Sequence, residues 1–165
     1  MTGNSRGFTL IELLIVVAII LTIAGIAIPN LLRSRIAANQ ASAVGTLRTL
    51  NTAEITYLST YNVGYSSMLS YLGPTASGAA PTSTLAGLVD SLLAGSGSNV
   101  STKSGYSFGY TPGTAVNNQI YTYQIVAKPV TVGTTGTNYY YTDHSGVLRQ
   151  NSTATAGSTD SPVGG

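Results

Sequence analysis

The sequence predicts an α+β fold in which one long N-terminal helix packs on a small antiparallel β-sheet. Three observations favour it. Residues 8–28 form an almost unbroken apolar run, helical periodicity continues to about residue 59, and segments rich in aromatic and β-branched residues follow Gly105. A small sheet is the natural cover for the apolar stripe of a helix, so we expect the two to share one core.

The apolar run from Phe8 to Ile28 has the length of a membrane-spanning helix. About 20 apolar residues cross a bilayer core, and the polar interruptions here are Thr9, Glu12 and Thr22. A charged side chain in hydrocarbon costs roughly 2.5–3.5 kcal/mol on insertion scales, so Glu12 needs a partner. A secretory signal peptide would carry its small-residue cleavage site after the apolar run, whereas Gly7 lies before it.

Pro29 follows the apolar run and predicts a kink in a helix that continues. Proline cannot donate to the carbonyl of Gly25, and its ring crowds that turn. The alternative is that the helix ends there. Against this, apolar residues still recur at three- and four-residue steps further on, at Val44, Leu47, Ile55 and Leu58. We therefore expect one kinked helix over residues 8–59, with a hydrophobic part (8–29) and an amphipathic continuation (30–60).

The segment Gly7-Phe8-Thr9-Leu10-Ile11-Glu12 resembles the processing and assembly motif of type IV pilins and of type II secretion pseudopilins. The resemblance combines a cleavage glycine, an aromatic residue after it, a glutamate at fixed spacing and a spanning helix. It implies that a prepilin peptidase removes a leader, residues 1–7, and that the new amine of Phe8 is methylated. It also implies the function of a structural subunit that polymerises into a surface filament for adhesion, motility or DNA uptake.

A cut before Phe8 would create a partner for Glu12. An α-amine has an ordinary pKa near ~8 and is mostly cationic at neutral pH, and residues i and i+4 share a helix face. Glu12 could pair with its own Phe8 amine, while the resemblance implies the amine of a neighbouring subunit. Only the second pairing sets an axial register, because a misplaced subunit leaves two charges unpaired in apolar surroundings. A third interpretation is that Glu12 merely favours the helix N-terminus electrostatically.

The resemblance also implies partners and location. It implies a homopolymer, pilus assembly machinery, and a chain that waits in the inner membrane with its N-terminus in the cytoplasm before it joins an extracellular filament. The positive-inside rule compares Arg6 with Arg33 and Arg35 and gives the opposite orientation; the difference is one charge, so we follow the motif. Two alternatives stay open: a pseudopilin of a type II secretion system, and a minor tip or adhesin subunit that binds a ligand.

The remaining sequence predicts an exported head that is not an enzyme. The chain has a net charge of +2 with 7% charged residues, so no basic patch indicates nucleic-acid binding. It has no cysteine, a departure from the many pilins that close their C-terminal region with a disulfide. His144 is the sole histidine, and its neighbours Asp143 and Ser145 on a turn do not have the geometry of a catalytic triad. Asp90, Asp143 and Asp160 are too scattered to predict a calcium site, so we expect neither metal nor cofactor.

Within the head we expect three regions. Residues 61–105 form a connection with a short helix near 84–94, capped by Ser83 or Thr84 and stopped by Gly95. An antiparallel sheet follows over 106–150, with strands at 106–110, 119–127, 139–142 and 147–150 and a turn at 143–146. Its tyrosines serve the sheet and subunit contacts. Residues 151–165 hold too little apolar content to order themselves, which predicts a flexible tail.

Overall fold

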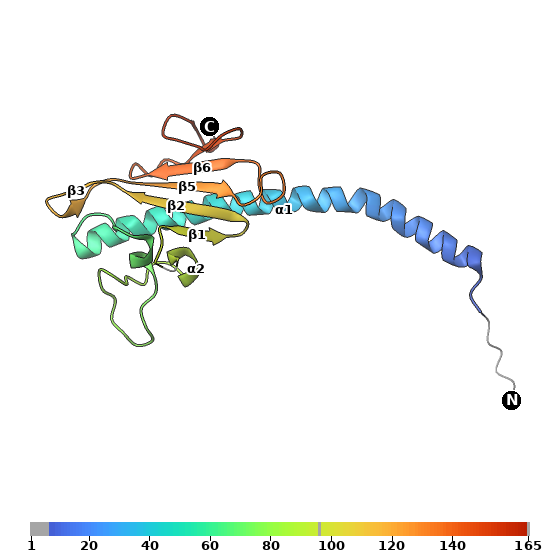
Figure 1. The fold of residues 1–165 in the computed structure, drawn as a ribbon, viewed down its shortest axis with the longest axis horizontal. Helices are drawn as coiled ribbons and strands as arrows, with labels where there is room; N and C mark the ends of the chain where they lie inside the picture. The colour runs from blue at the N-terminus through green and yellow to red at the C-terminus, as the bar shows by residue number, and fades with distance from the viewer. Residues whose placement is uncertain (1–6, 96, 165) are drawn as a thin grey trace. The chain divides into compact units, whose positions relative to one another are not determined.

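The computed structural model describes residues 7–95 and 97–164, so the expected leader lies outside the described residues except for Gly7. The α+β fold is confirmed: the long helix α1 (Leu10–Tyr61) is followed by the 3-10 helix η1 (Leu69–Leu72), the short helix α2 (Ser91–Ala94) and β-strands (Figure 1). The chain divides into two compact units, residues 1–35 and 36–165. The strands are β1 (Val100–Lys103), β2 (Tyr106–Pro112), β3 (Ala115–Val116), β4 (Gln119–Ile120), β5 (Tyr123–Pro129), β6 (Tyr139–Asp143), β7 (Arg149–Asn151) and β8 (Ser161–Pro162).

The main sheet is antiparallel throughout, with the strand order β1-β2-β5-β6-β7-β8. Its longest pairing joins β2 to β5, where Phe108 lies opposite Ala127 and Tyr110 lies opposite Ile125. Alternate residues of both strands are buried, as a sheet covered on one face requires. Figure 1 shows β2 and β5 lying along the C-terminal part of α1.

The core lies between this sheet face and the second half of α1. Leu47 and Leu50 of the helix are fully buried together with Phe108 and Ile125 of the sheet. The buried helix positions follow steps of four and three residues: Ala43, Leu47, Leu50, Glu54 and Tyr57. The apolar stripe predicted from the sequence is therefore wrong in its second half. At this point of the helix the residue that faces the core is Glu54, and Ile55 beside it lies off that face and is 56% exposed.

A buried polar bridge ties α1 to the sheet. The side chain of Asn51 accepts a hydrogen bond from the hydroxyl of Tyr123 at 3.0 Å and donates to the hydroxyl of Thr142 at 2.8 Å. All three residues are buried. The bridge therefore gives hydrogen-bond partners to one buried polar side chain each of α1, β5 and β6.

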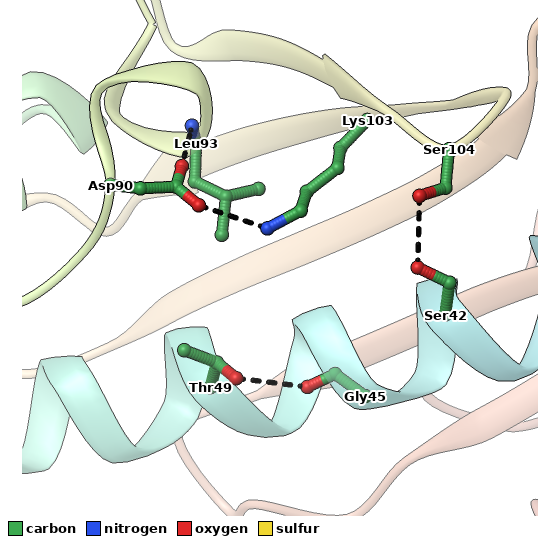
Figure 2. Close-up of polar contacts among 7 residues, drawn as sticks. All are labelled: Ser42, Gly45, Thr49, Asp90, Leu93, Lys103 and Ser104. Carbon is green, nitrogen blue, oxygen red and sulfur yellow. Dashed lines mark hydrogen bonds and ion pairs between the residues drawn. The ribbon is translucent and has the colours of Figure 1, made fainter.

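The helix expected near residues 84–94 is shorter than predicted, and its cap is a different residue. Only Ser91–Ala94 is helical, and the carboxylate of Asp90 accepts from the Leu93 amide as N-cap (Figure 2). The stretch before it is irregular instead, since the amides of Ala86 and Leu88 donate to the carbonyls of residues 71 and 72. Gly95 ends the helix with a φ of 67°, as expected.

The predicted strands also need one correction and one addition. The strand expected over 119–127 is divided, because β4 pairs with β3 in a separate hairpin while β5 begins at Tyr123. Asn117 and Asn118 both have positive φ at the turn of that hairpin, which is the conformation a tight two-residue hairpin turn requires. The strand β1, which forms the edge of the sheet beside β2, was not predicted.

The C-terminal segment is ordered, contrary to the predicted flexible tail. β8 pairs with β7, and Ala156 between them is buried. The carboxylate of Asp160 accepts from the Asn151 side chain at 2.9 Å and from the Gly157 amide at 2.7 Å. Polar contacts of this kind leave no trace in apolar content, which is why the composition was misleading.

Candidate functional site

The candidate site is the beginning of α1, where the sequence predicts processing and assembly residues. Gly7, Phe8 and Thr9 precede the helix, which begins at Leu10. The bond between Gly7 and Phe8 therefore lies in non-helical backbone, two residues before the first helical one. Phe8 is 85% exposed, and an added Cβ on Gly7 would meet no atom within 4 Å.

Thr9 and Glu12 form a reciprocal cap at this helix start. The carboxylate of Glu12 accepts from the Thr9 amide at 2.9 Å and from the Thr9 hydroxyl at 2.7 Å. The Glu12 amide in turn donates to the Thr9 hydroxyl oxygen at 3.3 Å. This is the capping box, in which a Thr at the N-cap and a Glu three residues later satisfy each other's backbone groups.

Thr9 was not predicted as a partner of Glu12, although its sequence signal was present. The spacing Thr-x-x-Glu before an apolar run is the sequence pattern of a capping box. The structure thus agrees with the view that Glu12 supports the helix N-terminus. It adds that both donors from Thr9 are neutral, so they leave the negative charge of the carboxylate uncompensated.

The helix after the cap carries an uncovered apolar surface. Every large apolar side chain from Phe8 to Ile28 is at least 47% exposed. The hydroxyl of Thr22, one of the polar side chains in this run, donates to the carbonyl of Ala18 at 2.8 Å, so its donor is satisfied within the helix itself. Among the described residues, α1 is the one helix long and apolar enough to cross a membrane by length and composition.

The two residues of the predicted kink lie within a continuous helix. Pro29 is inside α1, so the alternative in which the helix ends there is wrong. Gly25 has open space where a side chain would begin, and the chain's own packing does not require a glycine at this position. The bend itself stays a prediction.

The turn at residues 143–146 forms as predicted, and its contacts are structural. The Gly146 amide donates to the carbonyl of Asp143 at 2.9 Å. The Asp143 carboxylate accepts from the Ser145 amide and from the hydroxyl of Tyr141. Across residues 7–95 and 97–164, no three His, Cys, Asp or Glu side chains come together as metal ligands would.

The tyrosines that lie inside the head pack mainly against one another and the sheet. The rings of Tyr65 and Tyr123 meet edge to face with centroids 4.7 Å apart, and Tyr110 stacks on Tyr123 at 5.9 Å. Such pairs stabilise a core beyond their buried area. They give most of these side chains a role in the fold of the head.

Comparisons with known proteins agree with the resemblance found in the N-terminal segment. Residues 2–28 match the family model of the prokaryotic N-terminal methylation motif. The chain is 48% identical over 56 residues to the type IV major pilin protein PilA of Myxococcus xanthus, an alignment that covers 34% of this chain and 26% of the relative. It is 64% identical over 36 residues to the type IV wide pilus major component PilA4 of Thermus thermophilus, covering 22% and 28%.

The matched region is therefore short. The chain spans about a quarter of the length of these curated relatives. No solved structure gives a significant match to the chain. The similarity supports a type IV pilin, and the part of it with known bounds is the family-model match over residues 2–28.

Proposed function

We propose that the chain is a structural subunit of a type IV pilus, cut between Gly7 and Phe8 and assembled through the first part of α1. One observation carries the proposal: an exposed carboxylate, Glu12, lies four residues after the proposed new N-terminus on a helix whose apolar surface is uncovered. The family model of the N-terminal methylation motif matches residues 2–28, which include this segment, and the relatives similar to this chain are named as pilus components.

The cut changes the electrostatics of the helix start. Before it, Glu12 accepts only neutral donors from Thr9. After it, the amine of Phe8 supplies a cation one helical turn away in its own chain, and a neighbouring subunit can offer the same group. Charge-assisted hydrogen bonds are roughly twice as strong as neutral ones, so an amine competes well with the Thr9 donors for the carboxylate.

Pairing between subunits gives the filament its register. Lipid tails are as apolar as the side chains of α1, so exchanging lipid for helix contacts provides little hydrophobic gain. Specificity then depends on packing and on the Glu12 pairing. A subunit that arrives out of register would leave a carboxylate and an amine without partners in apolar surroundings.

The proposed location follows from the same helix. The first part of α1 anchors the subunit in the inner membrane, with the leader on the cytoplasmic side beside the prepilin peptidase. The head of residues 36–165 is then carried outward as the filament grows. Its contacts suit a structural role without catalysis, because the Asp143 carboxylate beside the sole histidine is already bonded to Ser145 and Tyr141.

A pseudopilin of a type II secretion system shares every feature used here, so it stays the second candidate. The two differ in where the processed chain accumulates. Protein sheared from the surface of source cells should contain abundant chain whose N-terminal peptide begins at a methylated Phe8, as read by mass spectrometry. Processed chain confined to the cell envelope would favour the pseudopilin, and chain retaining residues 1–7 would contradict the proposed processing.

Two variants separate the charge of Glu12 from its role in the cap. Glu12→Gln keeps a capping-box residue but removes the charge, so we expect normal cleavage and a strong loss of sheared filaments. Thr9→Ala removes the cap but keeps the charge, and we expect filament yield close to that of the unmodified chain. The opposite result, assembly by Glu12→Gln and failure of Thr9→Ala, would reduce Glu12 to a helix-capping residue.

A further inference from the structure

The head contains a buried carboxyl group that filament assembly does not use. Glu54 lies on the core face of α1 with none of its surface exposed. Glutamate is almost never fully buried without a paired charge. Among the described residues, no Lys, Arg or His lies within ion-pair distance of Glu54. The one ion pair in this part of the chain joins Lys103 to Asp90.

The hydrogen bonds to Glu54 come from neutral groups of one residue, Ser66, in the segment between α1 and η1. Its carboxylate accepts from the Ser66 amide at 2.9 Å and from the Ser66 hydroxyl at 2.6 Å. The same Ser66 hydroxyl lies 3.2 Å from the hydroxyl of Tyr110, which donates to the Ser66 carbonyl at 2.6 Å. The carboxyl group thus fastens Ser66 to α1, while the Tyr110 hydroxyl fastens the same residue to β2.

The titratable groups that face Glu54 are tyrosines from three elements: Tyr57 on α1, Tyr110 on β2 and Tyr123 on β5. All three stay neutral at physiological pH, because burial raises the pKa of each of them further above its ordinary value. Burial likewise raises the pKa of Glu54, against the opposing effect of the Ser66 hydrogen bonds. No neighbour therefore compensates a negative charge at this position.

We propose that Glu54 is a proton-operated lock on the chain that follows α1. When the carboxyl group is protonated, it is a neutral hydrogen-bonding group that suits its closed site, and Ser66 is held between α1 and β2. When the proton is released to solvent, the site must hold an uncompensated charge, and the chain around Ser66 opens more readily. The lock is a property of the head alone and does not depend on the proposed filament function.

The direction of the pH effect follows from the direction of the pKa shift. The folded chain binds the Glu54 proton more tightly than the unfolded chain does, since burial favours the neutral form. The contribution of Glu54 to stability is therefore complete below the pKa of an unfolded glutamate, about 4.3. It is lost as pH rises through the higher pKa of the folded state. The lock is closed in mildly acidic surroundings and weakened in alkaline ones.

Amide hydrogen exchange of the full chain in detergent micelles tests the lock. The protection factor of the Ser66 amide should fall between pH 4.5 and pH 8 in the unmodified chain, by about tenfold for each unit by which the pKa is raised. In Glu54→Gln, which keeps the shape and stays neutral, the protection factor should not change over this range. The same pH course in both chains would overturn the proposal.

A second measurement needs no variant at position 54. The chain contains two glutamates, Glu12 and Glu54, so Glu12→Gln leaves a single glutamate carboxyl carbon to follow by NMR. We expect it to titrate above the ordinary glutamate range. Ser66→Ala should move that midpoint upward again, because it removes a donor that favours the charged form. A midpoint at the ordinary value refutes the lock.

Discussion

Replacing Asn51 by alanine tests how the sheet is fastened to the second half of α1. The Asn51 side chain is the common partner of Tyr123 and Thr142, whose side chains are 3% and 0% exposed. The substitution leaves two buried hydroxyl groups without this partner. Each buried group left unsatisfied costs about 1–3 kcal/mol, so we expect a loss of about 2–6 kcal/mol in the free energy of unfolding. That is a large part of the roughly 5–15 kcal/mol that stabilises a typical domain.

Urea unfolding of the full chain in mild detergent measures this loss. Tyrosine fluorescence can follow it, because the chain has eleven tyrosines and no tryptophan. The variant Thr142→Val removes one hydroxyl and leaves one Asn51 donor unpaired, so it should cost less than Asn51→Ala. The double variant should then cost clearly less than the sum of the two single ones, as expected for residues that share one interaction.

A small loss would contradict the role of Asn51. If Asn51→Ala changes the unfolding free energy by less than about 0.5 kcal/mol, the level of an ordinary surface substitution, the bridge does not hold the helix to the sheet. Strict additivity of the two single variants would refute the shared network even if each is destabilising.

Two further predictions concern the cap of α2 and a glycine at the core. Asp90→Ala removes both the cap of α2 and the ion pair with Lys103 (Figure 2), whereas Lys103→Met keeps the cap and should cost about 0–1 kcal/mol in urea unfolding. Asp90→Ala should cost about 1 kcal/mol more than Lys103→Met, and equal losses would contradict the capping role. Gly136→Ala should cost about 1–3 kcal/mol by thermal or urea unfolding, because a Cβ there would overlap the fully buried Tyr106 ring and hydroxyl. The control Gly157→Ala, with open space around it, should be nearly neutral. Similar losses for both variants would show that the Tyr106 ring can move aside.

The sequence predicted best where local pattern alone decides the structure. The long apolar run and its helical continuation need no distant partner to be recognised, and richness in aromatic and β-branched residues marked β2 and the centre of the sheet. The candidate site is likewise local. Gly7, Phe8 and Glu12 were named from one short motif, and even the missed partner Thr9 lies three residues from Glu12.

The errors fall where distant contacts override local pattern. The spacing of Leu85, Leu88 and Leu92 suits a helix, yet the amides of residues 86–89 donate to carbonyls of residues 71–73 and this backbone stays irregular. In the same way, the spacing of apolar residues favoured Ile55 for the core. Glu54 lies beneath the sheet instead, because Ser66 supplies its hydrogen-bond partners. Partners twelve or more residues away cannot be read from helical or strand periodicity.

The ordered C-terminal segment has a consequence for how this head can be produced. Its loop is closed by the β7–β8 pairing and by the contacts of Asp160 with Asn151 and Gly157, and the chain has no cysteine. Folding of this region therefore requires neither an oxidising compartment nor a thiol oxidase or disulfide isomerase. The head should acquire the same C-terminal structure in a reducing cytosol as outside the cell, and reductants should leave it intact.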